Sequence, residues 1–326
     1  MTKEGYMNII DDFTNRFPNE ETCINYLKDQ RQDKLTCKRC GNHKHYWISS
    51  IQEFQCSKCN SRTSLTADTV MYKSKISIRQ WFMCIHLMTT VKKPFSALEM
   101  KRVLDLKSYD TAWNLMRKVR IMMGKRDARY QLSGHVEMDE GYFRVYRLPN
   151  RDQLGNRINE DVSIVTKKTK RGRGTDREIP VLLAVESTPT TQVKKYAKNR
   201  KMGYVKMTAI DSANSQEINY EAKNMVNKDA TVHTDGFNAY NKITDVVKNH
   251  VKMIVPPKDA MKKLPWIHTQ IANCKRELLG IHHSIKDDYL QLYLNEFCYK
   301  VNRRNFKLRD NFDGLIIACL DGNSLR

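Results

Sequence analysis

The stretch that decides the fold of the second half of the chain is His135-Val-Glu-Met-Asp139-Glu-Gly-Tyr-Phe143. It alternates as a β-strand does, so Val136 and Met138 share one face while Glu137 and Asp139 point to the other. An acid inside an apolar strand is unfavourable unless something neutralises its charge, and a bound divalent cation does so. Taken alone, the stretch fits a surface edge strand with solvated acids better.

A second stretch, Ala230-Thr-Val-His-Thr-Asp235-Gly236, places an aspartate where a predicted strand over 231–234 ends. A third, from Pro265 to Gly280, reads as one helix. His268 and Lys275 lie seven residues apart in it, two turns along one face. A metal ligand and a phosphate-pairing cation would then project into one cleft, and a basic helix with a structural histidine is the alternative.

The segments between these stretches predict the rest of this domain. The apolar run Pro180–Val185 fits a central strand, and the alternating Tyr204–Ile210 can pair next to it. Helices are expected at about 215–227, 237–248, 266–279 and 287–302, the last with the apolar spacing of an amphipathic helix. Strands followed by a strand that alternates with helices predict an α/β domain with a mixed sheet.

Nearer the N-terminus, four of the nine cysteines form two pairs, Cys37-Lys-Arg-Cys40 and Cys56-Ser-Lys-Cys59, with 15 residues between the pairs. This spacing is typical of a structural zinc site, with Tyr46–Ile48 and Phe54–Gln55 as the strands of a hairpin. An odd cysteine count argues against a disulfide framework. The pattern predicts a small zinc ribbon that draws folding free energy from about one bound ion per chain. Four free core cysteines are the alternative.

Helical periodicity follows the ribbon. Ser96 is a plausible N-cap with Glu99 in capping-box spacing, and a second helix that includes Ala112 follows Asp105–Ser108. Two short helices around a tight connection fit a helix-turn-helix, and a plain helical spacer is the alternative. The second helix carries side chains able to meet bases or phosphates, namely Tyr109, Asn114, Arg117, Lys118 and Arg120.

The charge points to a polyanionic partner. Lys and Arg number 57 against 36 Asp and Glu, a net charge of +21, which favours nucleic-acid binding. Two polar stretches, 144–160 and 167–177, read as loops, and we interpret the second as a clamp for DNA strands rather than a merely solvated face. Its basic residues are Lys167, Lys168, Lys170, Arg171, Arg173 and Arg177.

Composition excludes other classes of protein. With 40% hydrophobic and 29% charged residues, the chain is globular rather than disordered or fibrous. No apolar run reaches the roughly 18 residues of a membrane span, and the first residues lack a signal-peptide core. We therefore expect an intracellular protein without a membrane partner, in the cytoplasm or nucleoid of a bacterium or the nucleus of a eukaryote.

The order of these parts is specific. In this order the chain resembles ISXO2-like insertion-sequence transposases. The parts that carry the resemblance are the zinc ribbon, the helix-turn-helix-like segment, Glu137-Met-Asp-Glu140, Thr234-Asp-Gly236 and the block from Cys274 to Arg304. The resemblance runs from about residue 20 to 306. It implies an N-terminal zinc ribbon and an RNase H-like catalytic domain of the DDE superfamily. The expected boundaries are a helical lead at 1–30, the ribbon at 31–70, the helix-turn-helix-like segment at 71–128, the catalytic domain at 129–310 and a tail at 311–326.

The resemblance also implies the site. The first two acids map to Asp139 and Asp235, and the slot seven residues before Lys275 holds His268 where many members carry Glu. Magnesium or manganese would bind at Asp139, Asp235 and His268, with imidazole favouring manganese. Other third ligands stay open, Asn273 first and then Glu277 and Glu296.

The implied activity is metal-dependent DNA strand cleavage and transfer. Its partners would be double-stranded DNA, both terminal inverted repeats and target, and a second copy of the chain in a synaptic homodimer. One alternative is a non-catalytic zinc-ribbon DNA-binding regulator, which the missing third carboxylate favours. Another is an RNase H-like nuclease that hydrolyses without joining.

Overall fold

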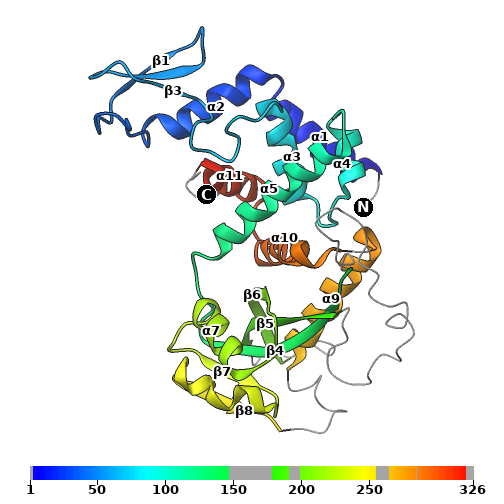
Figure 1. Ribbon diagram of the computed structural model, residues 1–326. Coiled ribbons are helices and arrows are strands. Elements are labelled where there is room, and N and C mark those ends of the chain that lie inside the picture. The colour runs from blue at the N-terminus through cyan, green and yellow to red at the C-terminus, as the bar shows by residue number, and fades with distance from the viewer. Residues whose placement is uncertain (1–2, 147–177, 191–198, 255–263, 284, 321–326) are drawn as a thin grey trace, which may run out of the picture. The chain divides into compact units, whose positions relative to one another are not determined.

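The computed structural model describes residues 3–146, 178–190, 199–254, 264–283 and 285–320 of the chain. They divide into two compact units. The first combines Met1–Arg126 with Asn305–Arg326, and the second is Asp127–Arg304. Each unit has a sheet and helices of its own (Figure 1). None of the helices in the described ranges is long and apolar enough to cross a membrane.

The second unit is built on a five-stranded mixed sheet in the order β6-β5-β4-β7-β8. β5 is antiparallel to β4 and β6, whereas β7 and β8 continue parallel to β4. An antiparallel meander that continues into parallel strands gives the predicted α/β, RNase H-like fold class. The strands are β4 (His135–Arg144), β5 (Glu178–Pro189), β6 (Arg200–Ala209), β7 (Thr231–Thr234) and β8 (Asn249–Lys252).

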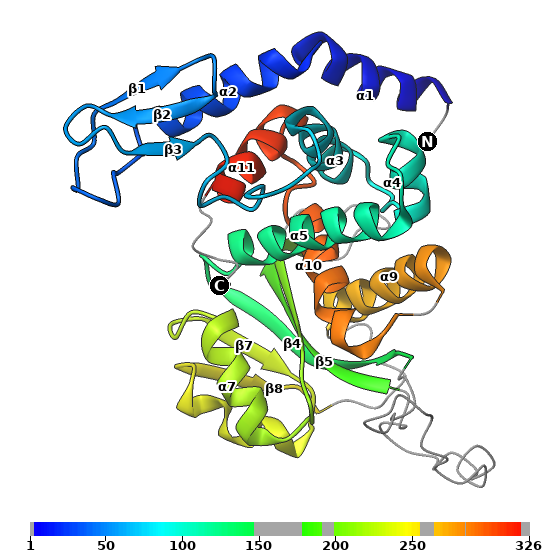
Figure 2. The same cartoon turned by 45° about the horizontal axis from the view of Figure 1, so that its top comes forward.

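Helices cover both faces of this sheet (Figure 2). They are α7 (Ser215–Met225), η1 (Asn238–Asp245), α9 (Pro265–His282), η3 (Asp287–Tyr289) and α10 (Leu290–Asn302). Met138 of β4 packs in one core with residues of α7 and η1, and Phe143 packs in the other with residues of α9 and α10. Because side chains alternate along a strand, Glu137 and Asp139 share the α9 face with Phe143.

One helix prediction is wrong in type. The segment predicted as a helix at 237–248 is a 3-10 helix over Asn238–Asp245, and the unpredicted strand β8 follows it. Phe237, Tyr240 and Ile243 recur every three residues, which is the repeat of a 3-10 helix. Strand β8 is mostly exposed, so its side chains give little apolar alternation.

The first unit is helical apart from a three-stranded antiparallel sheet. An aromatic cluster that includes Phe17, Phe82 and Phe312 fills its interior. Its elements are α1 (Lys3–Arg16), α2 (Glu20–Gln32), β1 (His45–Ile48), β2 (Glu53–Cys56), β3 (Arg62–Ser64), α3 (Ile78–Thr90), α4 (Ala97–Val103), α5 (Tyr109–Asp127) and α11 (Leu308–Leu320).

The expected tail at 311–326 differs from the structure, in which its residues up to Leu320 belong to α11. This helix packs against α3, and Asp313 accepts hydrogen bonds from Arg16 at 2.6 Å and from Tyr26 at 2.7 Å. Phe312, Leu315, Ile316 and Cys319 are buried with the i, i+3, i+4, i+7 spacing of an amphipathic helix. The chain therefore returns to its first unit after completing the second, and 321–326 lie outside the described residues.

The capping box predicted at Ser96 is confirmed. Its hydroxyl accepts the Glu99 N–H at 3.1 Å, and the Glu99 carboxylate accepts the Ser96 N–H at 2.9 Å. This cap starts α4, and α5 follows after a short connection. Use of the pair as a helix-turn-helix stays a prediction.

Candidate active site and metal centre

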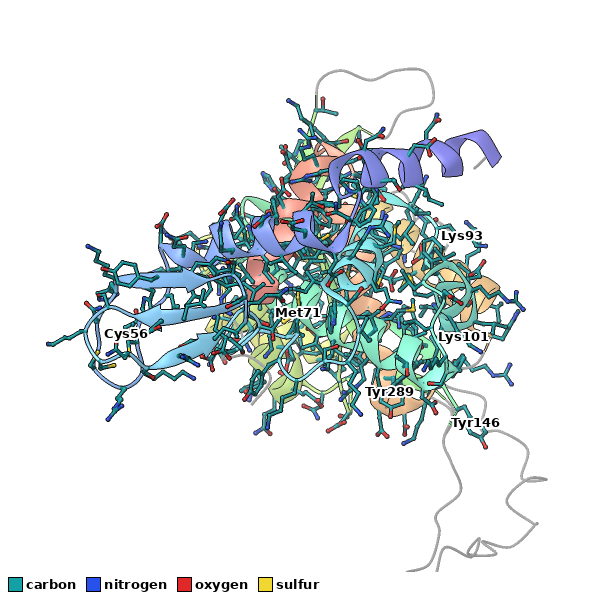
Figure 3. The ribbon with its side chains drawn as sticks, turned by 90° about the horizontal axis from the view of Figure 1, so that it is seen from above. Cys56, Met71, Lys93, Lys101, Tyr146 and Tyr289 are labelled. Carbon is teal, nitrogen blue, oxygen red and sulfur yellow. The ribbon has the colours of Figure 1, made fainter. Side chains whose placement is uncertain are left out.

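The two cysteine knuckles have the same backbone geometry. In the first, the N–H of Gly41 donates to the Cys37 carbonyl at 2.8 Å, and in the second the N–H of Asn60 donates to the Cys56 carbonyl at 3.1 Å. Gly41 and Asn60 both have positive φ, 71° and 56°, as residues that close such tight turns often do. The hairpin between β1 and β2 joins the knuckles, and Figure 3 shows Cys56 in this sheet.

The four sulfur atoms fit a single metal ion. Sγ of Cys37 lies 3.6 Å from Sγ of Cys59, and Sγ of Cys40 lies 3.5 Å from Sγ of Cys56. All four lie within 4.8 Å of one another. Ligands about 2.3 Å from a tetrahedral zinc ion would be about 3.8 Å apart. The predicted cluster can therefore hold a metal such as zinc.

Two of the thiols are also prepared for a cation. Burial raises the pKa of Cys56, but the backbone N–H groups of Cys59 and Lys58 help to outweigh it and lower that pKa to about 5. The N–H groups of Cys40 and Arg39 lower the pKa of Cys37. Thiolates are the form that binds metal, so Cys37 and Cys56 are prepared for a cation, whereas burial and the neighbouring cysteines raise the pKa of Cys40 to about 12 in the absence of an ion.

In the second unit, strand register brings two aspartates together. β4 and β7 are parallel, with Val136 opposite Val232 and Glu137 opposite His233. Two residues further along, the same register sets Asp235 beside Asp139 on the same sheet face. Asp235 follows the end of β7, where its Oδ1 accepts the Phe237 N–H at 2.8 Å. This local hydrogen bond fixes the side chain at the strand terminus.

Helix α9 supplies the third predicted group. Nδ1 of His268 lies 3.9 Å from Oδ2 of Asp139, and their side chains are 28% and 13% exposed. Ile271, one turn later, lies over Gly141, because a Cβ on that glycine would sit 3.3 Å from both Cγ atoms of Ile271. The missing side chain at Gly141 lets α9 approach β4 closely. The sequence singled out neither Gly141 nor Ile271.

Acidic side chains cluster around Asp139. Burial raises its pKa to about 8, with further contributions from the carboxylates of Glu140 and Asp235. Glu140 accepts a hydrogen bond from the hydroxyl of the fully buried Tyr240 at 2.9 Å. Burial and these same carboxylates raise the pKa of Tyr240, so it stays a donor. A cation at this place would relieve the repulsion between the acids.

Nδ1 of His268 and Oδ2 of Asp139 are close enough to approach one divalent ion. Two ligands about 2.1 Å from an octahedral ion lie about 3.0 Å apart when adjacent and about 4.2 Å apart when opposite, and the separation of this pair falls between the two, so binding an ion would require the side chains to shift. Among the described residues, only the four cysteines bring three or more such ligand atoms within 4.8 Å of one another. Asp235 contributes to the raised pKa of Asp139, but Asp139, Asp235 and His268 do not bring three ligand atoms within 4.8 Å of one another.

Comparison with models of known protein families identifies this part of the chain. The model of the ISXO2-like transposase domain matches residues 131–302, more than half of the 326 residues. The chain belongs to the ISXO2-like transposase domain family.

Other comparisons add little to this transposase assignment. The crystal structure of a pre-cleavage Mos1 transpososome is similar over 69% of this chain and 75% of that chain. The identity is 10% and the TM-score 0.25, too low for an argument about this chain. Comparison with curated proteins finds no match.

The other third ligands considered for this transposase have their described contacts on α9 and α10. Asn273 is exposed on α9, where its Oδ1 is 3.5 Å from Nη1 of Arg276. Glu296 is buried on α10 and pairs with Lys300 at 2.8 Å. Burial raises the pKa of Glu277 to about 7, and Lys300 and Glu296 are its charged neighbours. The described contacts of these three residues involve each other or α9 and α10 and do not include Asp139.

Lys275 lies two turns beyond His268, about 10 Å along the helix axis. Its Nζ is 5.4 Å from the centre of the Phe143 ring. It also lines a cavity of about 730 Å³ together with Arg144 and His283. The structure therefore places this cation beside the Asp139–His268 pair along β4, on the same face of α9, and not in direct contact with the pair.

The predicted DNA-binding side chains divide in two groups. In the transposase's first unit, Arg117 is half-buried, whereas Arg120 is only 2% exposed, so the expectation that Arg120 meets DNA is wrong. Nζ of Lys118 lies 3.5 Å from the Val70 carbonyl and 5.7 Å from the centre of the Trp81 ring. Its ammonium is thus directed at its own unit. Lys167, Lys168, Lys170, Arg171, Arg173 and Arg177 lie outside the described residues.

Proposed function

We propose that this transposase acts on an insertion sequence, binds its terminal inverted repeats and catalyses metal-dependent DNA strand cleavage and strand transfer. One observation supports this most. Parallel strands set Asp235 beside Asp139, and α9 places His268 3.9 Å from the same carboxylate. The pKa of Asp139, raised by burial and neighbouring carboxylates, indicates a site that gains from a cation.

The proposed roles follow from these positions. One bound magnesium or manganese ion would activate water or a DNA 3′-hydroxyl, and a second ion would stabilise the leaving oxygen. Asp139 and Asp235 would hold the first ion, and His268 would complete or orient a metal site from α9. Lys275 would pair with phosphate charge near the cavity that it lines. Tyr240 holds Glu140 by its hydrogen bond and keeps this second acid beside Asp139.

We also propose how the DNA is held. The ribbon, with zinc at Cys37, Cys40, Cys56 and Cys59, and the pair α4–α5 would bind the inverted repeats. The net charge of +21 supports DNA as the partner, since phosphates release counterions on binding. Arg117, Lys167, Lys168, Lys170, Arg171 and Arg173 remain proposed contacts, and a homodimer would join both ends.

The test is cleavage of inverted-repeat ends with magnesium or manganese. Asp139→Asn should lower cleavage on the order of 100-fold or more, because the ion loses a charged ligand. Asp229→Asn is the matched control, since Asp229 is an exposed aspartate of the same unit. Cleavage that survives Asp139→Asn would show that the reaction uses another site.

A non-catalytic regulator is the second candidate, because His268 stands where a third carboxylate is usual. Such a protein would bind the ends without cutting them in either metal. Cut ends that never join target DNA would instead indicate a hydrolytic nuclease. A single assay that separates bound, cut and joined products therefore distinguishes all three functions.

A further inference from the structure

Helix α9 begins without a cap of its own. Its N-cap is Leu264, which provides no side-chain hydrogen bond, and Pro265 at the next position has no N–H. The first N–H groups left to satisfy belong to Trp266 and Ile267. Both donate to Oε2 of Glu137 on β4, each at 2.9 Å.

Glu137 is buried and fully engaged. It is 1% exposed, its Oε1 accepts from the Ser187 hydroxyl at 2.5 Å, and Nε of Arg200 lies 3.8 Å away. A buried carboxylate needs such compensation, and the positive end of a helix dipole adds to it. The indole of Trp266 makes a second link by donating to the Arg200 carbonyl at 2.9 Å. Strands β4, β5 and β6 are thereby joined to the first turn of α9.

The hydrogen bonds between Glu137 and the first turn of α9 lie next to the candidate active site, both on the strand and on the helix. Glu137 precedes Asp139 by two residues on the same face of β4, and Ile267 immediately precedes His268. We propose that Glu137 is a positioning residue that fixes the first turn of α9 and so holds His268 against Asp139. The inference rests on the proposed function, because it assumes that Asp139 and His268 act together.

A matched control lies on the neighbouring strand. Glu186 of β5 also accepts two backbone N–H groups, from Ser133 at 3.0 Å and Tyr204 at 2.9 Å. Its substitution removes the same kind of hydrogen bonds from the same sheet, at groups that do not belong to α9. Any effect that is special to the position of His268 should appear with Glu137 and not with Glu186.

The first measurement needs no activity. Amide hydrogen exchange on the full chain without divalent ions should accelerate at Trp266 and Ile267 in Glu137→Ala, by about tenfold or more. In Glu186→Ala the acceleration should appear at Ser133 and Tyr204 instead. Manganese affinity should fall about 10- to 100-fold in Glu137→Ala and little in Glu186→Ala. Unchanged exchange and unchanged manganese affinity in Glu137→Ala would overturn the proposal.

Glu137→Gln separates positioning from direct participation and is available if Glu137→Ala fails to fold. A glutamine oxygen can still accept the two helix N–H groups, so manganese binding should recover to within a few-fold of wild type. If Glu137 were itself a metal ligand, Gln would be as damaging as Ala. A Gln variant no better than Ala would therefore refute the positioning role.

A double-mutant cycle then tests the route of action. In cleavage assays, Glu137→Ala should cost about tenfold in the wild type and less than about twofold in a His268→Ala background. Equal costs in both backgrounds would show that Glu137 does not act through His268. Asp139→Asn reports separately on the proposed function. If neither it nor the wild type cleaves DNA, that function fails, while exchange and manganese binding still decide the role of Glu137.

Discussion

Replacing Gly141 with alanine tests how closely α9 must pack on β4. The new Cβ would lie 3.3 Å from both Cγ atoms of Ile271 and 3.2 Å from Cε2 of Phe143. Favourable carbon–carbon contacts are about 3.5–4.0 Å, so these neighbours must move by a few tenths of an ångström. The Ile271 contacts push α9 away from the strand.

The expected magnitude is the difference of two effects. Overpacking a core typically costs about 1–3 kcal/mol. Alanine recovers about 0.5–1 kcal/mol, because glycine inside a strand loses more backbone entropy on folding. The free energy of unfolding should therefore fall by about 1 kcal/mol, which lowers Tm by about 3 °C for a unit of this size. Cleavage should fall about tenfold or more, because the shift moves His268 from Asp139.

Thermal unfolding and cleavage of inverted-repeat ends measure the two effects. Gly280→Ala, in the same helix, is the control, because a Cβ there meets nothing within 4 Å and should stabilise α9 slightly. Ile271→Ala removes both crowded Cγ atoms, so adding Gly141→Ala to it should cost little. An undiminished cost of Gly141→Ala in that background would refute the packing argument, as would a Tm equal to that of Gly280→Ala.

Three further outcomes follow from the contacts. Cys56→Ser should lose the expected zinc, about one ion per chain, and should bind DNA ends more weakly. The control Cys23→Ser, at a buried cysteine outside the cluster, should keep the metal. Metal analysis checks both variants, and zinc retained by Cys56→Ser would exclude the ribbon site. Burial and neighbouring acids raise the pKa of Asp139 to about 8, so the ionised form is disfavoured in the folded state. The free energy of unfolding of the metal-free protein should therefore fall as pH rises from about 4 to about 8. Urea midpoints measured across this range should fall less in Asp139→Asn than in the wild type. The same pH dependence in both proteins would contradict this reasoning. Lys118→Met should leave the salt dependence of DNA binding unchanged, because Nζ of Lys118 faces the Val70 carbonyl. Arg117→Met should reduce the slope of log affinity against log salt concentration by about 1. A reduced slope in Lys118→Met and an unchanged slope in Arg117→Met would contradict the placement of Lys118.

Periodicity in the sequence was sufficient where the apolar residues of an element recur with one clear period. The alternation of Val136 and Met138 predicted β4, although the structure buries residues on both of its faces, and the spacing from Leu290 predicted α10. The two cysteine pairs predicted the metal cluster for a different reason. Four ligands at fixed spacing leave few ways to fold around one ion.

Contacts between distant segments could not be predicted from the sequence. Glu137 and Trp266 are 129 positions apart, and nothing in either stretch indicates that a strand carboxylate caps a remote helix. Lys118 likewise appeared as a free cation in a basic helix, because periodicity does not reveal the Val70 carbonyl that faces it. The signal for α11 was present at Phe312–Cys319 but was read as a tail, since it lies beyond the family block.

The candidate site depends on how one helix follows one strand. Alternate residues of β4 contact successive positions of α9. Glu137 accepts hydrogen bonds from the first turn of the helix, and Asp139 lies near His268. Gly141 lies under Ile271, and the ring of Phe143 lies near the ammonium of Lys275. The six residue steps from Glu137 to Phe143 span about 20 Å along the strand, but the eight steps from Ile267 to Lys275 span only about 12 Å along the helix. The difference is bridged at the two ends by the long side chains of Glu137 and Lys275, while the closest approach falls at Gly141. The position of residue 268 is thus set by contacts on either side of it, independently of its own chemistry. These neighbouring contacts therefore decide where the imidazole of His268, the proposed metal ligand, lies.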